Sequence, residues 1–502
     1  MKNLFFPLLT ALIVFSSCNQ PDEKEGLAKK YCSTCHLFPA PSLLDKKTWQ
    51  NGVLPEMAFR MGLDISKLPG TNSAELNEIL KAIPPEPLVS KKEWESIRDY
   101  YANAAPDTLL TVPTNNLSPL RQFEASIVKL PIEGKTMLTL IRADPSCKNI
   151  FIGTRKGELY RFRKSLILED SFQLESPPSD ITFDDNGNKI LSCMGIMDPN
   201  DRAAGSVVAL AADGKNSVLL VDSIKRPVHI QSVDLNNDQE QDLLVSAFGN
   251  FTGALLAFEK NGGQYHQHVL HNFPGTRMTI VRDFNNDGLQ DVLALIAQGD
   301  ERIALFTNRG KFKFSYQVLL KFPPVYGSSY LELRDFNSDG KEDILYTNGD
   351  NADYSSILKP YHGVRIFLND GQNHFSQSWF YPMHGASMAR AVDFDEDGDL
   401  DIAAISFFPD FEKHPEHSFL YFENDGGKFT AFQTPLAASS RWITMEVADI
   451  DDDQDDDLIL GALAFPMAVP DSLYEVWGKN QTSLLILRNN LVKVRPFRIG
   501  HD

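Results

Sequence analysis

The pattern of hydrophobic and polar residues divides the chain into three parts. An apolar run occupies residues 4–15, directly after a charged start. Between residues 93 and 101, apolar side chains recur at helical spacing, which predicts an amphipathic helix. From about residue 120 onward, short runs of β-branched and aromatic residues alternate with Gly, Asn and Asp, which predicts a series of strands. The expected fold class is therefore multidomain, with a small all-α domain followed by an all-β one.

The apolar run at the start has the features of a secretion signal. It is too short to cross a membrane in the mature protein, and the small residues Ser16 and Ser17 follow it. Because Cys18 comes directly after them, the segment resembles a bacterial lipoprotein signal. That resemblance implies a signal peptide at residues 1–17, lipidation of Cys18 and an acidic tether at residues 18–25. An ordinary signal peptide with an incidental cysteine is the alternative.

A lipid anchor of this kind would hold the protein on the cell envelope, outside the cytoplasm. The anchor would then be the protein's only contact with the membrane, and the outer membrane is its expected location. The sequence leaves open whether the protein faces the periplasm or the cell surface.

Residues 31–36 read Tyr-Cys-Ser-Thr-Cys-His and contain the Cys-x-x-Cys-His pattern of covalent haem attachment. The thiols of Cys32 and Cys35 are spaced to reach the two vinyl groups of one porphyrin, and His36 then presents its imidazole to the iron. A zinc half-site and a redox dithiol are the alternatives. Zinc would need further ligands nearby, and residues 37–146 contain no other Cys or His. The sequence therefore predicts one covalent haem c.

The surroundings of this motif favour the haem interpretation. A short helix is expected at residues 26–31, just ahead of the motif, and the amphipathic helix at residues 93–101 comes later. Over about residues 22–105, this arrangement resembles the crossed terminal helices of class I cytochromes c. The resemblance implies a cytochrome c-like haem domain at residues 26–105, followed by a linker at residues 106–119.

The same resemblance implies a methionine as the sixth ligand of the iron. The candidates in this region are Met57 and Met61. Met57 is preferred because it follows a Leu-Pro step, as axial methionines often do in this family, although it lies only 21 residues after His36. A Met/His ligand pair would raise the reduction potential and suit electron transfer.

Five acidic loops of nine residues recur between residues 234 and 457, and their first aspartates stand 49, 52, 58 and 56 residues apart. Oxygen ligands at positions 1, 3, 5 and 9 of such a loop can converge on one hard cation, and Gly at position 6 permits the sharp turn. Gln239 and Gln454 replace that Gly in two loops. A solvated acidic surface is the alternative, but carboxylates this close would repel one another without a cation. The sequence therefore predicts up to five Ca²⁺ ions, and the expected side-chain ligands are Asp234, Asn236, Asp238, Asp242, Asp283, Asn285, Asp287, Asp291, Asp335, Asn337, Asp339, Asp343, Asp393, Asp395, Asp397, Asp401, Asp449, Asp451, Asp453 and Asp457.

Each acidic loop separates two predicted strands, and an Asn-x-Gly turn often separates the next two. These repeats resemble the FG-GAP and VCBS repeats of integrin-α-like β-propellers over about residues 120–502. Degenerate acidic turns near residues 144 and 184 extend the period upstream, so that seven turns predict seven blades. The sequence does not tell which terminus supplies the outer strand of the last blade.

The strand order predicts two different propeller faces. The acidic loops and the Asn-x-Gly turns lie on one face, and the loops between second and third strands lie on the other, together with the connections between blades. We expect a partner or substrate, such as a glycan, an anion or a protein, on this second face. An alternative role for each candidate residue is to tie one blade to the next. The candidates are His229, Arg277, Tyr330, His384, Arg441 and Trp442.

The net charge of −19 is concentrated in the acidic loops, which hold 24 of the 67 acidic residues and one basic residue. The acidity is therefore mainly a metal-binding property, and it argues against nucleic-acid binding. The five cysteines comprise the predicted anchor, the two haem thiols, and Cys147 and Cys193, which are either a disulfide or two free thiols.

These features predict a membrane-anchored c-type cytochrome that passes single electrons and uses a calcium-stabilised propeller to bind a partner or substrate. One alternative is a haem-linked oxidoreductase acting on a sugar or alcohol held in the propeller, and another is an adhesion module with an accessory haem. No compact set of residues identifies a catalytic base, so the catalytic residues, the redox partner and the ligand are left open.

Overall fold

The computed structural model describes most of the chain. Within the described residues, no helix is both long and apolar enough to cross a membrane. Cys18 and Cys147, on which two of the expectations above depend, lie outside them. The described residues are 23–63, 73–110, 117–132, 136–145, 148–184, 186–210, 217–352 and 355–491.

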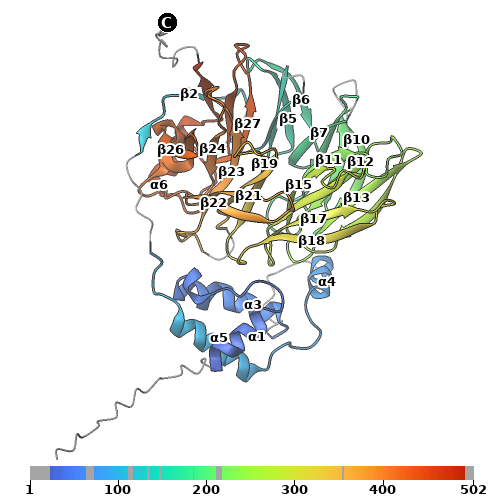
Figure 1. The fold of residues 1–502 in the computed structure, drawn as a ribbon, viewed down its shortest axis with the longest axis vertical. Coiled ribbons are helices and arrows are strands. Elements are labelled where there is room, and N and C mark those ends of the chain that lie inside the picture. The colour runs from blue at the N-terminus through green and yellow to red at the C-terminus, as the bar shows by residue number, and fades with distance from the viewer. Residues whose placement is uncertain are drawn as a thin grey trace, which may run out of the picture.

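Seven helical segments of the described residues precede the strands, and most of them lie together beside the β-structure (Figure 1), whereas η4 (Pro415–Ser418), η5 (Pro435–Ser439) and α6 (Asp471–Asn480) lie among the later strands. The expected amphipathic helix is present, with Trp94, Ile97 and Tyr101 buried. It begins with a capping box, in which Glu93 N–H donates to the Ser90 hydroxyl and Ser90 N–H donates to the Glu93 carboxylate. The segments are α1 (Glu23–Cys32), η1 (Pro41–Leu43), α2 (Lys46–Thr48), the π-helical turn η2 (Trp49–Val53), α3 (Leu54–Arg60), α4 (Ser73–Lys81) and α5 (Lys91–Ala104).

Helices α1 and α5 pack against each other around one apolar core. The rings of Trp49 and Tyr101 meet at the centre of this core, with 4.3 Å between their centroids. Both residues are almost fully buried. The same core reaches the propeller through Val325, which is also buried in it.

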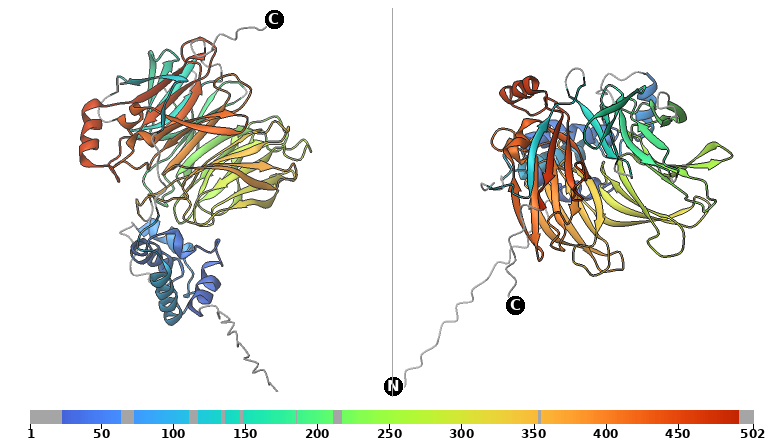
Figure 2. Two further views of the ribbon diagram at one scale, coloured as in Figure 1. Left: turned by 60° about the vertical axis from the view of Figure 1, so that its left-hand side comes forward. Right: turned by 90° about the horizontal axis from the view of Figure 1, so that it is seen from above.

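Seven sheets arranged in a ring make up the β-structure of the described residues (Figures 1 and 2). The predicted seven-bladed β-propeller is therefore present. The strands of the first four sheets are β3 (Leu138–Ala143), β4 (Asn149–Thr154), β5 (Glu158–Arg163), β6 (Leu168–Gln173), β7 (Pro178–Phe183), β8 (Lys189–Cys193), β9 (Gly205–Leu210), β10 (Ser217–Ile224), β11 (Pro227–Val233), β12 (Asp242–Ala247), β13 (Ala254–Asn261), β14 (Gln264–His271), β15 (Thr276–Arg282), β16 (Asp291–Ile296), β17 (Arg302–Asn308) and β18 (Phe314–Lys321).

The N-terminal part of the β-structure closes the ring. Strand β2 pairs antiparallel with β29, so it is the outer strand of the last sheet. The innermost strand β3 contacts both β7 and β27. The strands of the remaining sheets are β19 (Ser328–Arg334), β20 (Asp343–Asn348), β21 (Gly363–Asn369), β22 (Phe375–Pro382), β23 (Ala386–Val392), β24 (Asp401–Ser406), β25 (Phe419–Asp425), β26 (Lys428–Gln433) with β1 (Ser118–Pro119) beside it, β27 (Trp442–Ala448), β28 (Asp457–Ala462), β29 (Leu484–Asn489) and β2 (Phe123–Val128).

Helix α4 lies against the propeller and is joined to it by ion pairs (Figure 1). The Glu75 carboxylate accepts a hydrogen bond from the Arg202 guanidinium at 3.1 Å, and Glu78 accepts one from the Lys225 ammonium at 2.8 Å. Both propeller residues belong to the face that carries the loops between second and third strands and the connections between blades. The helices therefore cover part of the face on which a ligand was expected.

Apolar and polar contacts extend this junction beyond α4. The ring of Phe59 meets that of Phe251 edge to face, with 5.6 Å between centroids. On the other side, the Tyr361 hydroxyl donates to the Leu43 carbonyl at 3.0 Å. The helical segments and the propeller therefore share a continuous interface with both apolar and hydrogen-bonded contacts. We call this interface the junction.

Candidate functional site

A cavity of about 1300 Å³ lies at the junction. It exceeds the roughly 300–1,000 Å³ of typical ligand pockets. Both parts of the protein contribute to its walls. The residues of the helical segments that line it include Cys32, Cys35, His36, Met57 and Met61. The propeller residues that line it include Arg226, Phe251, Arg277, Glu301 and Asp350.

The Cys-x-x-Cys-His motif lies at the end of α1 and opens toward this cavity. His36 Nδ1 is 2.8 Å from the carbonyl oxygen of Leu37. Because a carbonyl only accepts hydrogen bonds, Nδ1 carries the proton and Nε2 keeps its lone pair. Burial lowers the pKa of His36, which favours the neutral imidazole. A histidine held in this tautomer by a backbone carbonyl is typical of a metal ligand.

The chain after His36 is fixed by two aromatic residues of the helical core. The Tyr101 hydroxyl donates to the Pro39 carbonyl at 2.8 Å, and Trp49 Nε1 donates to the Pro41 carbonyl at 2.8 Å. These bonds hold the loop that carries the histidine against α5 and η2. The motif is therefore anchored to the core through its following loop.

Met57 and Met61, the two candidate sixth ligands, lie on α3 and at its C-cap. Both side chains are partly buried, pack against the same apolar core as Cys32 and line the cavity. A Met/His-ligated haem c needs two thiols that bond to its vinyl groups, and an imidazole and a thioether that bind its iron. The residues present fit that group, and either methionine can supply the thioether.

Cationic side chains line the propeller wall of the cavity. Arg226 donates to the carbonyls of Gly249 and Met197 at 2.6 and 3.3 Å, and its guanidinium lies over the Phe248 ring. Burial lowers the pKa of both Arg226 and Arg277. This wall can attract an anion or a hydroxylated ligand, because both guanidiniums line the cavity, although the negative charge of Asp350 acts on each of them.

A buried carboxylate on the same wall has a structural role. Glu301 accepts hydrogen bonds from the backbone N–H groups of Gly327 and Ser328 at 3.0 and 2.8 Å. Burial raises the pKa of Glu301 to about 7. Glu301 therefore ties one blade to the next while lining the cavity.

In the first four acidic loops position 1 accepts the same backbone N–H groups, as the loop at Asp283 illustrates, whereas Asp449 in the fifth accepts from the N–H of Asp452 at 2.8 Å. Both oxygens of Asp283, at position 1, accept backbone N–H groups, from Asp287 at 3.1 Å and from Gly288 at 2.8 Å. Asp291, at position 9, accepts the N–H of Phe284 on one oxygen and the N–H of Asn308 on the other. The loop is therefore folded around its own carboxylates.

The bridge made by position 9 recurs in all five loops. Each of these aspartates is fully buried and accepts one N–H from the loop and one from the third strand of its sheet. Burial and the neighbouring carboxylates raise the pKa of Asp401 to about 7, and to about 6 for Asp242 and Asp457. A bound cation would relieve the cost of ionising these groups. The aspartates are Asp242, Asp291, Asp343, Asp401 and Asp457.

The fourth and fifth loops bring three carboxylates closest together. In the fourth, oxygens of Asp393, Asp395 and Asp397 lie within 4.8 Å of one another. Asp449, Asp451 and Asp453 do the same in the fifth. Such convergence is what a Ca²⁺ site requires.

Cationic side chains from elsewhere in the chain contact the fifth loop, and the sequence did not indicate these contacts. The Lys164 ammonium lies 3.4 Å from the Asp449 carboxylate, and Arg488 lies 3.6 Å from Asp451. Lys164 comes from a neighbouring sheet, 285 residues away in the sequence. These cations partly compensate the charge of this loop, so a metal ion would compete with them there.

The six residues that were expected to bind a ligand do not all line the cavity. Arg277 lines the cavity. His229 Nδ1 lies 2.6 Å from Asp180, and the Tyr330 hydroxyl accepts from Arg390 at 3.2 Å. His229 and Tyr330 therefore take part in contacts between inner strands of different sheets.

The other three ligand-face candidates pack within the propeller. His384 Nδ1 lies 3.2 Å from the Lys359 carbonyl. Trp442 is fully buried and donates to the Ala437 carbonyl at 2.9 Å. Arg441 is also fully buried, and its guanidinium is surrounded by aromatic rings. These rings belong to Phe407, Phe408 and Phe411.

The structure also places residues in the site that sequence reasoning missed. Arg226, Lys225 and Phe251 form the propeller side of the junction or cavity. Each stands in a short loop with no repeated motif, so no local sequence signal indicates it. Cys193 is a buried free thiol, and its expected partner Cys147 lies outside the described residues.

The fold defines a seven-bladed β-propeller protein. A model of the FG-GAP-like repeat matches residues 283–346 and 335–404, so the propeller contains FG-GAP-like repeats. These matches cover the second, third and fourth acidic loops. A comparison with curated proteins gave no match.

Several solved structures are similar to this chain. The Pan2 WD40 domain of Neurospora crassa has 13% identity and a TM-score of 0.44, and the alignment covers 74% of this chain and 98% of that one. The N-terminal domain of Nup159 has 10% identity and a TM-score of 0.43, with 75% and 98% covered. The Cps50 (Swd1) β-propeller domain of Myceliophteria thermophila has 11% identity and a TM-score of 0.42, with 73% and 100% covered.

Proposed function

We propose that this protein is a lipid-anchored, extracytoplasmic c-type cytochrome that transfers single electrons at the junction between its helices and its propeller. The observation that carries this proposal is the cavity, which is lined by Cys32, Cys35 and His36 and by two methionines. When bound, the haem would supply reversible one-electron chemistry. Cys32 and Cys35 would hold it covalently, and His36 Nε2 would face its iron.

In this proposal the propeller has two roles. Its acidic loops bind Ca²⁺ on the face opposite the junction and stabilise the blades, because hard cations prefer such oxygen ligands. Its other face closes the haem cavity and offers Arg226 and Arg277 to a partner or a substrate. Electrons would therefore pass close to the propeller wall.

The shared cavity also favours a second function, oxidation of a substrate held between the propeller wall and the haem. A small polyol or organic anion bound by Arg277 would then be the electron donor. Haem reduction on addition of sugars, alcohols or hydroxy acids separates this enzyme from an electron carrier. A carrier is reduced only by a redox partner or a chemical reductant.

The test of electron transfer uses the full chain produced in a host that matures c-type cytochromes. We expect a reversible one-electron titration and a sulfur-to-iron charge-transfer band in the oxidised protein. Met57→Ala removes this band and lowers the potential, whereas Met61→Ala, the matched control from the same helix end, keeps both. The opposite result assigns Met61. A protein with no reversible haem redox change contradicts the proposed function.

A further inference from the structure

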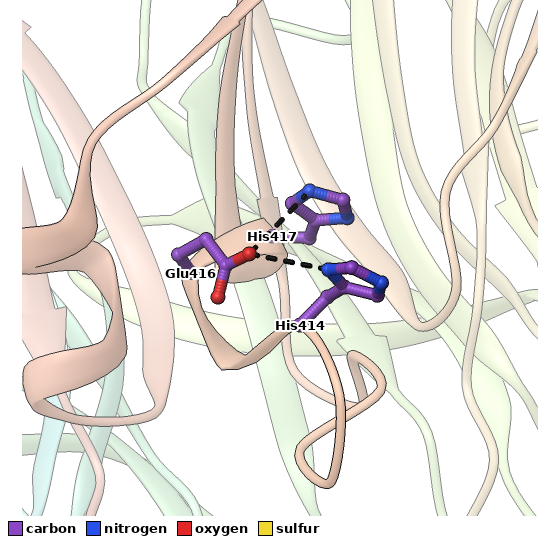
Figure 3. A group of neighbouring side chains, drawn as sticks. All are labelled: His414, Glu416 and His417. Carbon is purple, nitrogen blue, oxygen red and sulfur yellow. Dashed lines mark hydrogen bonds and ion pairs between the residues drawn. The ribbon is translucent and has the colours of Figure 1, made fainter. Parts of the chain in front are cut away.

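A compact cluster of two histidines and a glutamate lies outside the junction cavity and the acidic loops. His414, Glu416 and His417 stand in the loop between β24 and β25, at the short helix η4 (Pro415–Ser418) (Figure 3). One carboxylate oxygen of Glu416 faces both imidazoles. The cluster belongs to the same propeller face as the junction, because it lies between a second and a third strand.

The distances within this cluster suit a metal ion. Glu416 Oε1 lies 3.2 Å from His414 Nδ1 and 3.8 Å from His417 Nε2. The ligand atoms of all three residues lie within 4.8 Å of one another. Two ligands of a tetrahedral Zn²⁺ ion stand about 3.3 Å apart, given metal–ligand bonds of roughly 2.0–2.2 Å. The observed spacing requires only a small contraction around an ion.

Local hydrogen bonds and burial hold the cluster in place. The N–H of His414 donates to the Asp410 carbonyl at 2.8 Å, and the N–H of Lys413 donates to the Asp410 carboxylate at 3.1 Å. The side chains of His414 and Glu416 are each 23% exposed, and that of His417 is 13% exposed. Half-buried imidazoles are easier to bring to a metal than solvated ones, because less water must be displaced. One side of the cluster stays open to solvent.

The rings of His414 and His417 are stacked, with 4.7 Å between centroids and 11° between planes. A metal ion lies near the plane of each imidazole that binds it, so both rings must rotate toward Glu416 when an ion enters. Both histidines already direct a ring nitrogen at the same carboxylate oxygen (Figure 3). The required change is therefore a rotation of the two histidine side chains.

We propose that His414, Glu416 and His417 form a site for one late first-row divalent cation, Zn²⁺ in the first place. Imidazole ligands select such ions over Ca²⁺, which prefers oxygen alone. Two histidines and one glutamate are the protein ligands of open, three-ligand zinc sites, which keep a fourth position for water or another ligand. The site is separate from the proposed haem and Ca²⁺ sites in both donor type and position.

Isothermal titration of the untagged full chain with ZnCl₂ tests this proposal. Excess Ca²⁺ occupies the acidic loops, and a Cys32→Ser/Cys35→Ser background removes the thiols that would also bind zinc. We expect one equivalent of Zn²⁺ to bind. The double variant His414→Ala/His417→Ala weakens this binding more than about tenfold.

His374→Ala is the matched control, because His374 pairs with Asp370 in a single-histidine cluster at 2.9 Å. It leaves the zinc affinity unchanged. If the double variant fails to fold, the Co²⁺ spectrum of the unmutated chain decides, since ligand-field bands of tetrahedral intensity support the site. Equal zinc affinity of the double variant and its parent, or the absence of such bands, overturns the proposal.

Discussion

Asp180 shows how one buried side chain connects the inner strands of three sheets. Its carboxylate lies 2.9 Å from the Arg142 guanidinium, 2.6 Å from His229 Nδ1 and 3.2 Å from the N–H of Ile230. Burial alone would raise the pKa of Asp180, but the attraction of Arg142 and His229 is larger and lowers it overall. The carboxylate is therefore ionised in the folded protein.

Asp180→Asn removes this charge and leaves Arg142 without its closest partner. We expect the variant to lose about 3 kcal/mol of the free energy of unfolding at neutral pH, because breaking a buried ion pair leaves Arg142 with only the more distant Glu446, 3.9 Å away. Since the folded pKa lies below the unfolded one, the stabilisation is present above about pH 4 and disappears as the pH falls. Urea unfolding from acid to neutral pH measures this difference.

The control for this experiment is Asp222→Asn, at an exposed position in β10. It leaves the stability almost unchanged at every pH. The interpretation of Asp180 is wrong if Asp180→Asn and the parent protein lose stability in parallel on acidification.

At the scale of single elements, the acidic loops combine two kinds of aspartate. Position 9 begins the second strand and binds backbone N–H groups with both oxygens, as Asp401 does with Phe394 and Asn424. Positions 3 and 5 lie in the turn itself, where Asp395 approaches Asp397. The first kind holds the strand pair together, and the second kind gathers charge for a cation.

Two substitutions in the fourth loop separate these roles. Asp401→Asn destabilises the protein by about 1–3 kcal/mol even without Ca²⁺, because it disturbs buried hydrogen bonds. Asp395→Asn leaves the metal-free stability unchanged or slightly raised, since it relieves repulsion, and reduces the stabilisation by Ca²⁺. Thermal unfolding in Ca²⁺ and in chelator measures both effects. Equal unfolding temperatures of the parent in the two buffers would contradict the Ca²⁺ assignment.

At the scale of the whole molecule, the helical segments cover part of one propeller face at the junction (Figure 2). Its contacts include Phe59 with Phe251 and Leu43 with Tyr361. The arrangement keeps Cys-x-x-Cys-His close to the propeller wall. In the proposed function, this closeness lets the propeller influence electron transfer.

We expect the double variant Phe251→Ala/Lys225→Ala to loosen this junction, because it removes an aromatic contact and the ion pair with Glu78. Amide hydrogen exchange should accelerate in α4 while the central strands keep their protection. The control is Leu219→Ala on β10, where the residue is 57% exposed. It leaves hydrogen exchange unchanged in α4 and in the central strands. Unaltered exchange in α4 of the double variant would show that these contacts do not hold the helices.

Much of this architecture follows from local sequence signals. Acidic turns at blade spacing predict seven sheets, because the conformation of a turn depends on neighbouring residues. Apolar residues at helical spacing predict α5 around Trp94 and Tyr101. These two predictions depend on the local order of residues, and the structure confirms both.

Long-range placement could not be predicted in this way. The pairing of β2 with β29 joins opposite ends of the propeller, and an alternating strand pattern does not name its partner. Lys164 reaches the fifth acidic loop from another sheet. Arginine is usually exposed, yet Arg441 is enclosed by aromatic rings and the Met467 carbonyl. Such contacts depend on how the blades of the whole propeller are arranged.

The mass of the intact chain, purified from a host that matures c-type cytochromes, tests the central claim most directly. We predict a mass increased by one haem that remains after acid extraction, and no increase in the Cys32→Ala/Cys35→Ala variant. A chain that carries no covalent haem, from cells that mature a control cytochrome c, would contradict the account.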